Sequence, residues 1–202
     1  MSPERVVLFV DVQNLYRGAR RAFFPHSRSH VDGQFDPMQL GQLICSQTAG
    51  GVTRSFHQVR VYTGRPSAAK DSKGYAANRR QCAAWEKWGA KVFAHPLRYP
   101  PDYPNSKPQQ KGIDVALAID FIALAIDDEY DVGVIASADT DLRPALEFVY
   151  KRYQGIRQIE VAAWRSPLMR VRLSVRGAEI PCHWLYKAHY DQIADLTNYN
   201  IP

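Results

Sequence analysis

The chain has 202 residues, of which 46% are hydrophobic and 23% are charged, and its formal net charge is +6. This composition is typical of a globular protein and excludes a disordered or fibrous chain. The length fits one domain, expected over residues 1–202, and the basic excess permits nucleic acid as a partner without requiring it.

Apolar patterns along the chain alternate between strands and helices. Residues 5–10 form a continuous apolar run, which is typical of a strand covered on both faces. The expected strands are residues 5–10, 56–64, 90–96, 131–137, 157–164 and a short one near 180–184. The expected helices are residues 14–24, 37–47, 73–89, 112–127, 140–153 and one near 167–175. The helix over 112–127 is nearly all apolar, so we expect it to be buried.

Strands that alternate with helices predict βαβ units. The expected fold class is therefore α/β, with a mostly parallel central sheet of about five or six strands flanked by helices. Residues 164–202 carry weaker signals and are expected to extend the same domain. Sheets of this kind bind ligands at the carboxyl ends of their strands. Residues 97–111 contain four prolines and form a long loop, which we expect to be functional.

Cysteine usage and the amino-terminal residues indicate the cellular compartment. Cys45, Cys82 and Cys182 are few and widely spaced, which favours reduced thiols over a disulfide framework or a zinc site. The apolar run before Asp11 is too short for a signal peptide or a membrane-spanning helix. We expect a cytoplasmic protein with no membrane contact.

Aspartates stand at the ends of two expected strands and at the start of one expected helix. Asp11 closes the first strand, Asp139 and Asp141 follow the fourth strand, and Asp114 opens the apolar helix. Each acid alone has a simpler explanation, because aspartate caps helices and favours their amino termini. Four of them at one sheet edge are harder to explain by capping alone, since clustered carboxylates repel unless a cation or proton lies between them. A cluster of carboxylates suits Mg²⁺ better than zinc.

Asp120 requires a separate interpretation. It lies about 9 Å further along the same helix than Asp114 and on a different face, so we do not expect one metal ion to contact both. Its sequence neighbours are apolar, and an unpaired charge among them would be costly. We interpret Asp120 as a structural acid, or as one that contacts and orients the metal ligands, rather than as a metal ligand itself.

Three segments resemble the signature blocks of the NYN domain, a branch of the PIN-like nuclease superfamily. They occur in family order within residues 5–163, and they read VVLFVDVQNLY (6–16), KGIDVALAIDFIAL (111–124) and YDVGVIASADTDLRPALEFV (130–149). The resemblance implies a Rossmann-like, PIN-type sheet that carries an acidic pocket. It also implies dependence on a divalent metal, Mg²⁺ or Mn²⁺, and hydrolysis of RNA.

The resemblance also implies the site residues. Carried over one position at a time, the family's catalytic pattern falls on Asp11, Asn14, Asp114, Asp139 and Asp141. We expect Asp11, Asp114 and Asp139 to hold one or two cations, with Asp141 near the rim. A water activated near Asp11 and Asp139 would attack the phosphorus, and Asn14 would orient a ligand or the phosphate.

Basic and aromatic side chains are expected to surround these acids. A basic rim around an acidic centre suits a phosphodiester, and tyrosines can stack on unpaired bases, so single-stranded RNA is the expected partner. For any one arginine, the alternative is an ordinary solvated surface. The candidates for RNA binding are Arg17, Arg20, Arg21, Lys107, Lys111, Arg143 and Tyr16, with Tyr99 and Tyr103 as further stacking candidates.

The leading hypothesis is a divalent-metal-dependent endoribonuclease, but other classes stay open. Val12 and Ala138 stand where the family usually has glycine, and Leu142 stands where an aromatic residue is usual. Because a changed pocket backbone can keep binding while losing metal geometry, an RNA-binding or scaffolding module with little catalysis is the alternative. A phosphatase is disfavoured, since DVQN replaces its D-x-D-x-T/V pattern, and no G-x-G-x-x-G supports a dinucleotide enzyme. Cleavage of DNA, a homo-oligomer and a protein partner all remain open.

Overall fold

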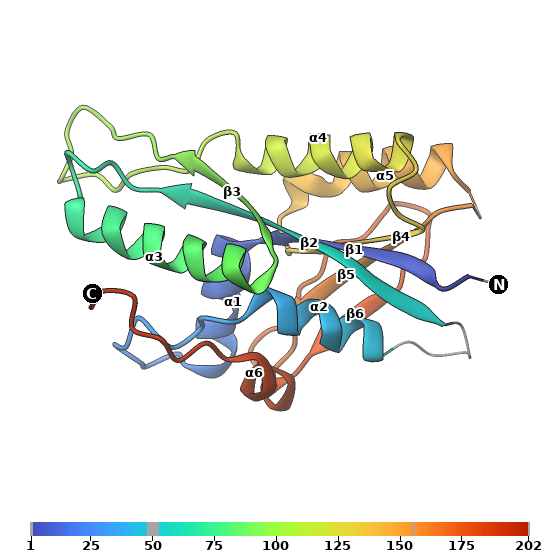
Figure 1. The fold of residues 1–202 in the computed structure, drawn as a ribbon, viewed down its shortest axis with the longest axis horizontal. Coiled ribbons are helices and arrows are strands. Elements are labelled where there is room, and N and C mark those ends of the chain that lie inside the picture. Colours follow the sequence, from blue (N-terminus) through green and yellow to red (C-terminus); the bar gives the residue numbers. More distant parts are fainter. Residues whose placement is uncertain (1, 48–52, 155, 202) are drawn as a thin grey trace.

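The computed structural model describes residues 2–47, 53–154 and 156–201, along which strands and helices alternate (Figure 1). The strands are β1 (Glu4–Asp11), β2 (Arg54–Arg65), β3 (Lys91–Pro96), β4 (Val132–Ala136), β5 (Gln158–Trp164) and β6 (Cys182–Leu185). The α-helices are α1 (Val12–Phe23), α2 (Pro37–Ser46), α3 (Ser72–Trp88), α4 (Ile113–Ile126), α5 (Arg143–Arg152) and α6 (Lys187–Ile193). A short 3₁₀ turn, η1 (Thr140–Leu142), precedes α5.

A six-stranded sheet forms the middle layer of the molecule. Its strand order is β3-β2-β1-β4-β5-β6, and all neighbouring strands run parallel. Helices α4 and α5 cover one face, and α1, α2 and α3 cover the other (Figure 1). The expected α/β class with a Rossmann-like parallel sheet is confirmed. Strand order reverses beside β1, and ligands bind such sheets at that point.

The residues of β1 alternate between two hydrophobic cores. Val6, Leu8 and Val10 pack with α1 and α2, whereas Val7 and Phe9 pack with α4 and α5. All five side chains are at most 1% exposed. Because both faces of the strand are covered from Val6 onwards, it is apolar from there until Asp11 at the carboxyl end of the sheet.

Helix α4 is not buried on all sides, as its apolar sequence suggested. Leu117 and Phe121 are fully buried against the sheet, but Val115 and Ile119 are each 60% exposed. The expectation was wrong because α4 belongs to an outer layer, where a helix packs against the sheet on one face only. No helix among the described residues has both the length and the apolar character needed to span a membrane.

The helix expected near residues 167–175 is also absent from the described structure. This segment instead carries two isolated bridges, Ser166–Met169 and Val175–Ala178. Leu173 and Val175 are both buried with an exposed residue between them, a two-residue alternation that belongs to extended chain rather than to helix. The expected strand near 180–184 is present as β6, and the short helix α6 follows it without having been predicted.

A buried ion cluster lies near the amino-terminal edge of the sheet, far along β1 from Asp11. Arg54 on β2 contacts Glu160 on β5 at 2.7 Å and Glu4 on β1 at 3.2 Å, and His183 contacts Glu160 at 2.6 Å. Burial favours the neutral form of Glu160, but hydrogen bonds to His183 and Arg54 outweigh it and lower its pKa to about 2. The cluster therefore holds a charged Glu160 between three strands.

We predict that Glu160→Gln destabilises the fold by about 3 kcal/mol at neutral pH, because it leaves the guanidinium of Arg54 buried without its main partner. Since the folded pKa of Glu160 is depressed, its contribution is present above pH ~4.5 and is lost as pH falls towards ~2. Urea denaturation at several pH values measures both effects. The exposed pair of Lys187 and Asp191 provides a control, and Asp191→Asn should change stability by less than about 1 kcal/mol.

Candidate metal centre and nucleic-acid interface

Three carboxylates meet at the carboxyl end of the sheet. Asp11 ends β1, and Asp139 follows β4, which pairs with β1 so that Val10 lies beside Ala136. Asp114 enters from the first turn of α4. One oxygen from each of these three carboxylates lies within 4.8 Å of the others. The parallel pairing of β1 with β4 thus brings together acids that are more than a hundred residues apart in the sequence.

The start of α4 depends on a glycine. Gly112 precedes the helix with φ of 80°, in the left-handed region that favours glycine. The turn ends the 97–111 loop and starts the helix two residues before Asp114. The K-G-x-D spacing is thereby explained, since the glycine makes the turn that delivers the acid to the sheet edge.

Asp11 is almost fully buried and is tied to both neighbouring segments. The residue is only 4% exposed. Its carboxylate accepts hydrogen bonds from the backbone N–H of Asn14 at 3.1 Å and from Ser137 Oγ at 3.0 Å. The first bond makes Asp11 the amino-terminal cap of α1. The capping interpretation of Asp11 is therefore confirmed, and the same carboxylate also lies in the acidic cluster with Asp114 and Asp139.

The neighbouring polar groups form one connected network. Ser137 Oγ also accepts a hydrogen bond from the backbone N–H of Asp139 at 3.0 Å, and Asn14 Oδ1 accepts one from the N–H of Ala138 at 3.0 Å. Asp139 Oδ1 in turn accepts from the N–H of Asp141 at 3.0 Å and caps η1. The loop after β4 is thus fixed to the end of β1 by side chains from both segments.

The pKa values of two of the acids reflect burial and mutual repulsion. Burial raises the pKa of Asp11 to about 6, against the opposing hydrogen bonds from Asn14 and Ser137, and the charges of Asp114 and Asp139 raise it further. Burial also raises the pKa of Asp114, as do the charges of Asp139 and Asp141. Crowded carboxylates of this kind are stabilised by a cation bound among them, so the donor set fits a hard divalent ion.

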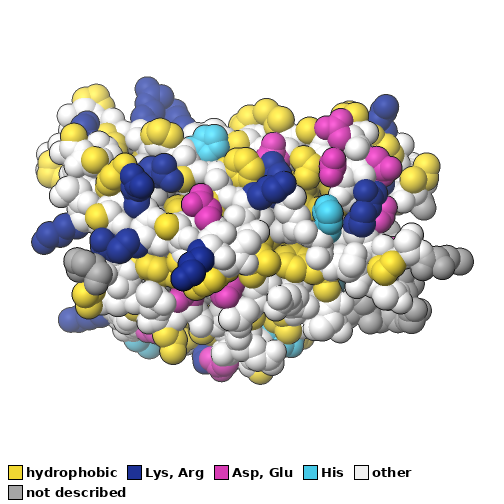
Figure 2. Space-filling model, viewed as in Figure 1, with side chains coloured by type: hydrophobic (Ala, Val, Ile, Leu, Met, Phe, Trp, Pro, Cys, Tyr) yellow, Lys and Arg dark blue, Asp and Glu magenta, His cyan; other side chains and the backbone are white. Residues whose placement is uncertain are grey.

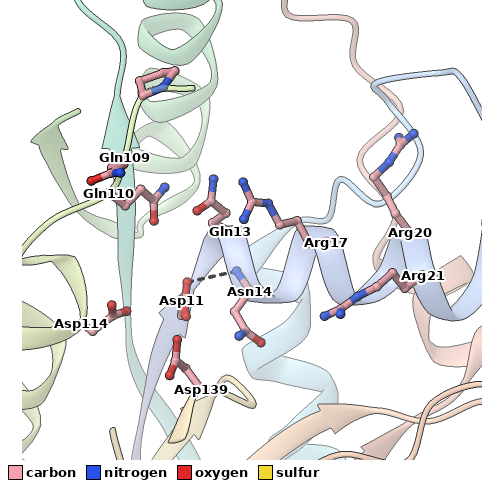
Figure 3. Close-up of a pocket in the computed structure, with 11 residues that line it drawn as sticks. Asp11, Gln13, Asn14, Arg17, Arg20, Arg21, Gln109, Gln110, Asp114 and Asp139 are labelled. Atoms are coloured by element: carbon pink, nitrogen blue, oxygen red, sulfur yellow. Dashed lines mark hydrogen bonds between the residues drawn. The ribbon is translucent and has the colours of Figure 1, made fainter. Parts of the chain in front are cut away.

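The acids line one side of an open cavity of about 720 Å³ (Figure 3). Asn14 and Gln13 come from the start of α1, and Pro108, Gln109 and Gln110 come from the loop after β3. Arginines of α1 complete the lining. The 97–111 loop therefore borders the site through its last residues. In the face that Figure 2 shows, Lys and Arg side chains gather mainly at the end towards which the strands point, the left end of the view.

The three arginines of α1 differ in what they contact. Arg20 donates hydrogen bonds to the backbone oxygens of Ser27, Ser29 and Asp32, and it points away from the acids in Figure 3. Arg17 and Arg21 are exposed, line the cavity and make no hydrogen bond or ion pair with the described residues. Arg20 thus holds the 27–32 loop in place, while Arg17 and Arg21 are free to meet a ligand.

Other residues proposed from the sequence lie outside this cavity. Lys107 and Lys111 are exposed on the loop beside it, and Asp141 is exposed beyond Asp139. Arg143 begins α5 and is half-buried. Tyr16 donates a hydrogen bond to the backbone oxygen of His30 at 2.9 Å and lines an adjoining cavity.

Asp120 and the loop tyrosines make contacts of their own. Asp120 accepts hydrogen bonds from Arg60 and from the hydroxyl of Tyr62, both at 2.6 Å, and all three lie between α4 and β2. Tyr99 and Tyr103 pack edge to face with ring centroids 4.8 Å apart and bond to the backbone of residues 67 and 70. These contacts fasten α4 and the long loop to β2 and the segment after it.

The departures from the family pattern cause no backbone strain. Within the described ranges, Asp128 is the one non-glycine residue with a positive φ, so neither Val12 nor Ala138 occupies a conformation that needs glycine. Ala138 still supplies its N–H to Asn14, and Leu142 is fully buried in the core beneath α5.

The structure adds site residues that the sequence did not single out. Ser137 is fully buried and bonds to both Asp11 and the backbone of Asp139. Gln13 and Gln110 line the cavity from opposite elements. Ser137 could have been found from its place between a buried strand and the D-x-D pair, but Gln110 depends on how the long loop folds back.

Comparisons with known proteins agree with this arrangement. The family model of the NYN domain matches residues 5–170. The crystal structure of a protein of unknown function from Vibrio parahaemolyticus has a similar fold, with a TM-score of 0.53, 21% sequence identity, and coverage of 80% of this chain and 82% of that chain. At this identity the likeness concerns the fold alone. None of the curated proteins compared with the chain matches it.

We predict that Asp11→Asn removes the pH dependence that the buried Asp11 carboxylate imposes on the metal-free protein. Because the folded pKa of Asp11 lies above its unfolded value of about 3.9, the folded state binds more protons between pH ~4 and ~6, and stability falls as pH rises through that window. The effect amounts to at most about 3 kcal/mol. Asparagine keeps the helix-cap acceptor without the charge.

Urea denaturation in EDTA at pH 4 to 7.5 measures this difference. The wild-type protein should lose stability over the window while Asp11→Asn stays level, and Mn²⁺ should restore stability to the wild type alone. If stability changes with pH by the same slope in the two proteins, Asp11 does not have the raised pKa expected of a buried carboxylate in a cation site.

Proposed function

The chain belongs to the NYN domain family, a branch of the PIN-like nuclease superfamily, and we propose that it is a divalent-metal-dependent ribonuclease that hydrolyses RNA phosphodiester bonds. One observation supports this most strongly. Three carboxylates with oxygens within 4.8 Å of one another line a cavity whose opposite wall carries unpaired arginines. The pairing of a cation site with a phosphate-binding wall is what metal-assisted phosphodiester hydrolysis needs.

The acids would hold the metal, Mg²⁺ or Mn²⁺. Their donor atoms are all carboxylate oxygens, which suit these hard cations, and the raised pKa values of Asp11 and Asp114 reflect repulsion that a cation would relieve. When bound, such an ion lowers the pKa of a water molecule and neutralises charge on the leaving oxygen. Ser137 and the backbone N–H of Asn14 keep Asp11 fixed and ready to bind it.

The remaining residues would position the substrate. Arg17 and Arg21 are free to bind the phosphates on either side of the scissile bond. Asn14 uses its amide oxygen to accept from Ala138, which leaves its Nδ2 as a donor towards the cavity. Asp141 adds negative charge near the rim and supports the orientation of Asp139 through its backbone. A flexible single strand fits this recessed site better than a rigid duplex does.

We predict that Asp139→Asn lowers the cleavage rate of labelled single-stranded RNA by at least about a hundredfold. The reason is that the variant removes a ligand of the metal, and the metal would both activate the attacking water and stabilise the leaving oxygen. Asparagine can still accept the hydrogen bond from Asp141, so the loop after β4 should keep its shape. RNA affinity in EDTA should stay level or rise, since a charge that repels phosphate is removed. Rates with Mn²⁺, Mg²⁺ and EDTA, on RNA and on DNA, test the proposal.

Equal cleavage by the wild type and Asp139→Asn would assign the activity to another site or to a contaminant. If neither protein cleaves RNA or DNA with Mn²⁺ but both bind RNA, the alternative of a binding module replaces the nuclease.

We predict the opposite behaviour for the double variant Arg17→Ala, Arg21→Ala. Two lost phosphate contacts should weaken binding of single-stranded RNA and reduce the slope of log K against log salt by about 1.4. Anisotropy titrations at several salt concentrations in EDTA measure this. Arg176→Ala is a matched control, since Arg176 is exposed and lies outside the cavity. A slope equal to that of the wild type would remove the two arginines from the RNA-binding surface.

A further inference from the structure

A second cavity of about 590 Å³ adjoins the acidic one on the other side of the α1 start. It is bounded by α1, the carboxyl end of β2, the inner face of α3 and the chain near residues 199–200. Gln13 and Gln110 line both cavities, so the two spaces share a wall made of two amide side chains. In Figure 3 these two glutamines lie near each other above the acids.

The second cavity differs from the first in its chemistry. Its described lining holds no Lys or Arg and one carboxylate, Asp71, which caps α3, whereas three arginines and three carboxylates line the acidic cavity. Its polar lining is dominated by amides, which can donate and accept hydrogen bonds at once. These amides are Gln13, Gln34, Asn78, Gln81, Gln110 and Asn200. A cavity of this kind suits a neutral ligand that carries both donors and acceptors, and it lacks the charge that a phosphate requires.

A buried donor in this cavity has no partner. Trp85 on α3 is only 1% exposed and lines the cavity, and its indole Nε1 makes no hydrogen bond to any described residue. A buried N–H without an acceptor is costly, and most such groups in proteins are satisfied. The N–H has almost no accessible surface in the empty cavity, so an acceptor atom on a bound ligand would satisfy it after a small movement of the Trp85 ring.

The walls of the cavity are held in place by specific contacts. Gln81 donates to Gln34 at 3.0 Å, and Gln34 donates to the backbone oxygen of Thr197 at 3.0 Å, which links α3 to the C-terminal segment. Gly64 at the end of β2 lets Gln110 approach so closely that a Cβ there would lie 2.8 Å from the amide nitrogen of Gln110. Gln34 and Gln81 are thus fixed before any ligand arrives.

We propose that this second cavity binds a nucleobase of the RNA whose phosphate occupies the acidic cavity, and that it gives the site a base preference. The inference rests on the proposed function, because that function places the RNA phosphate in the acidic cavity and so brings a neighbouring base to the second one. A base is a planar, neutral ring with donors and acceptors on its edge, which matches the amides and the indole N–H of Trp85. Tyr16, on the α1 wall, adds an aromatic ring for stacking.

The test uses the whole 202-residue chain in EDTA, so that binding is measured without cleavage. Seven-nucleotide single-stranded RNAs, each with one abasic position, are titrated by anisotropy, and the best position is then filled with each of the four bases. For the wild type, one abasic position should weaken binding roughly tenfold or more. Ala77→Phe, which places a large ring in the cavity from α3, should remove that sensitivity and the base preference.

Two further variants make the result specific. Ala83→Phe places the same side chain on the exposed face of α3, outside the cavity, and should behave as the wild type. Trp85→Phe keeps an aromatic ring but removes the N–H, and should reduce the base preference roughly fivefold. Should Ala77→Phe fail to fold, Trp85→Phe decides the matter.

The proposal is overturned if no abasic position matters in the wild type, or if folded Ala77→Phe and Trp85→Phe proteins keep the full preference. Cleavage of RNA together with a uniform abasic scan would overturn the base site alone and leave the nuclease intact. A base preference that responds to these variants in a protein that never cleaves would instead overturn the nuclease and leave the base site intact.

Discussion

Asp11 ends the central strand of the sheet with its carboxylate almost wholly removed from water, and a charge in that position must be compensated by its surroundings. The compensation comes from the first turn of α1, through the N–H of Asn14, and from the end of β4, through Ser137. Each of these groups is then used again, since Ser137 also fixes Asp139 and Asn14 also fixes Ala138. The hydrogen bonds that compensate one buried carboxylate therefore also set the position of Asp139, the second of the three acids.

The sequence was sufficient for the parts of this arrangement that follow from strand ends. An apolar run covered on both faces must stop where the sheet stops, so Asp11 and Asp139 could be placed at one edge before the structure was known. Asp114 could be added only because it opens the helix after the long loop and matches the K-G-x-D block of the resemblance, since a helix start need not lie at the same edge as the strand ends. The sequence was less informative where contacts depend on folded loops. Arg20 has the same sequence setting as Arg17 and Arg21, yet its guanidinium is used by the 27–32 loop.

The second cavity illustrates the same limit. Its lining comes from α1, β2, α3, the long loop and the C-terminal residues, and no short motif links them. The helix expected near residues 167–175 was wrong, because this segment is extended and carries two isolated bridges, with Leu173 and Val175 buried on one side of it. Local periodicity predicts elements well, whereas the partners of a long side chain depend on segments that the periodicity does not describe.

The balance of charge at the site links cation binding to phosphate binding. Three carboxylates close together would repel a phosphate, and the two unpaired arginines opposite them do not fully offset that charge. A divalent ion among the acids would leave one net negative charge there, so that Arg17 and Arg21 would make the cavity attractive to a phosphodiester. Each ligand would then strengthen the binding of the other by the same factor, because linkage is reciprocal. The second cavity has no Lys or Arg and only Asp71 as a carboxylate, so recognition of a base there depends less on whether a metal is bound.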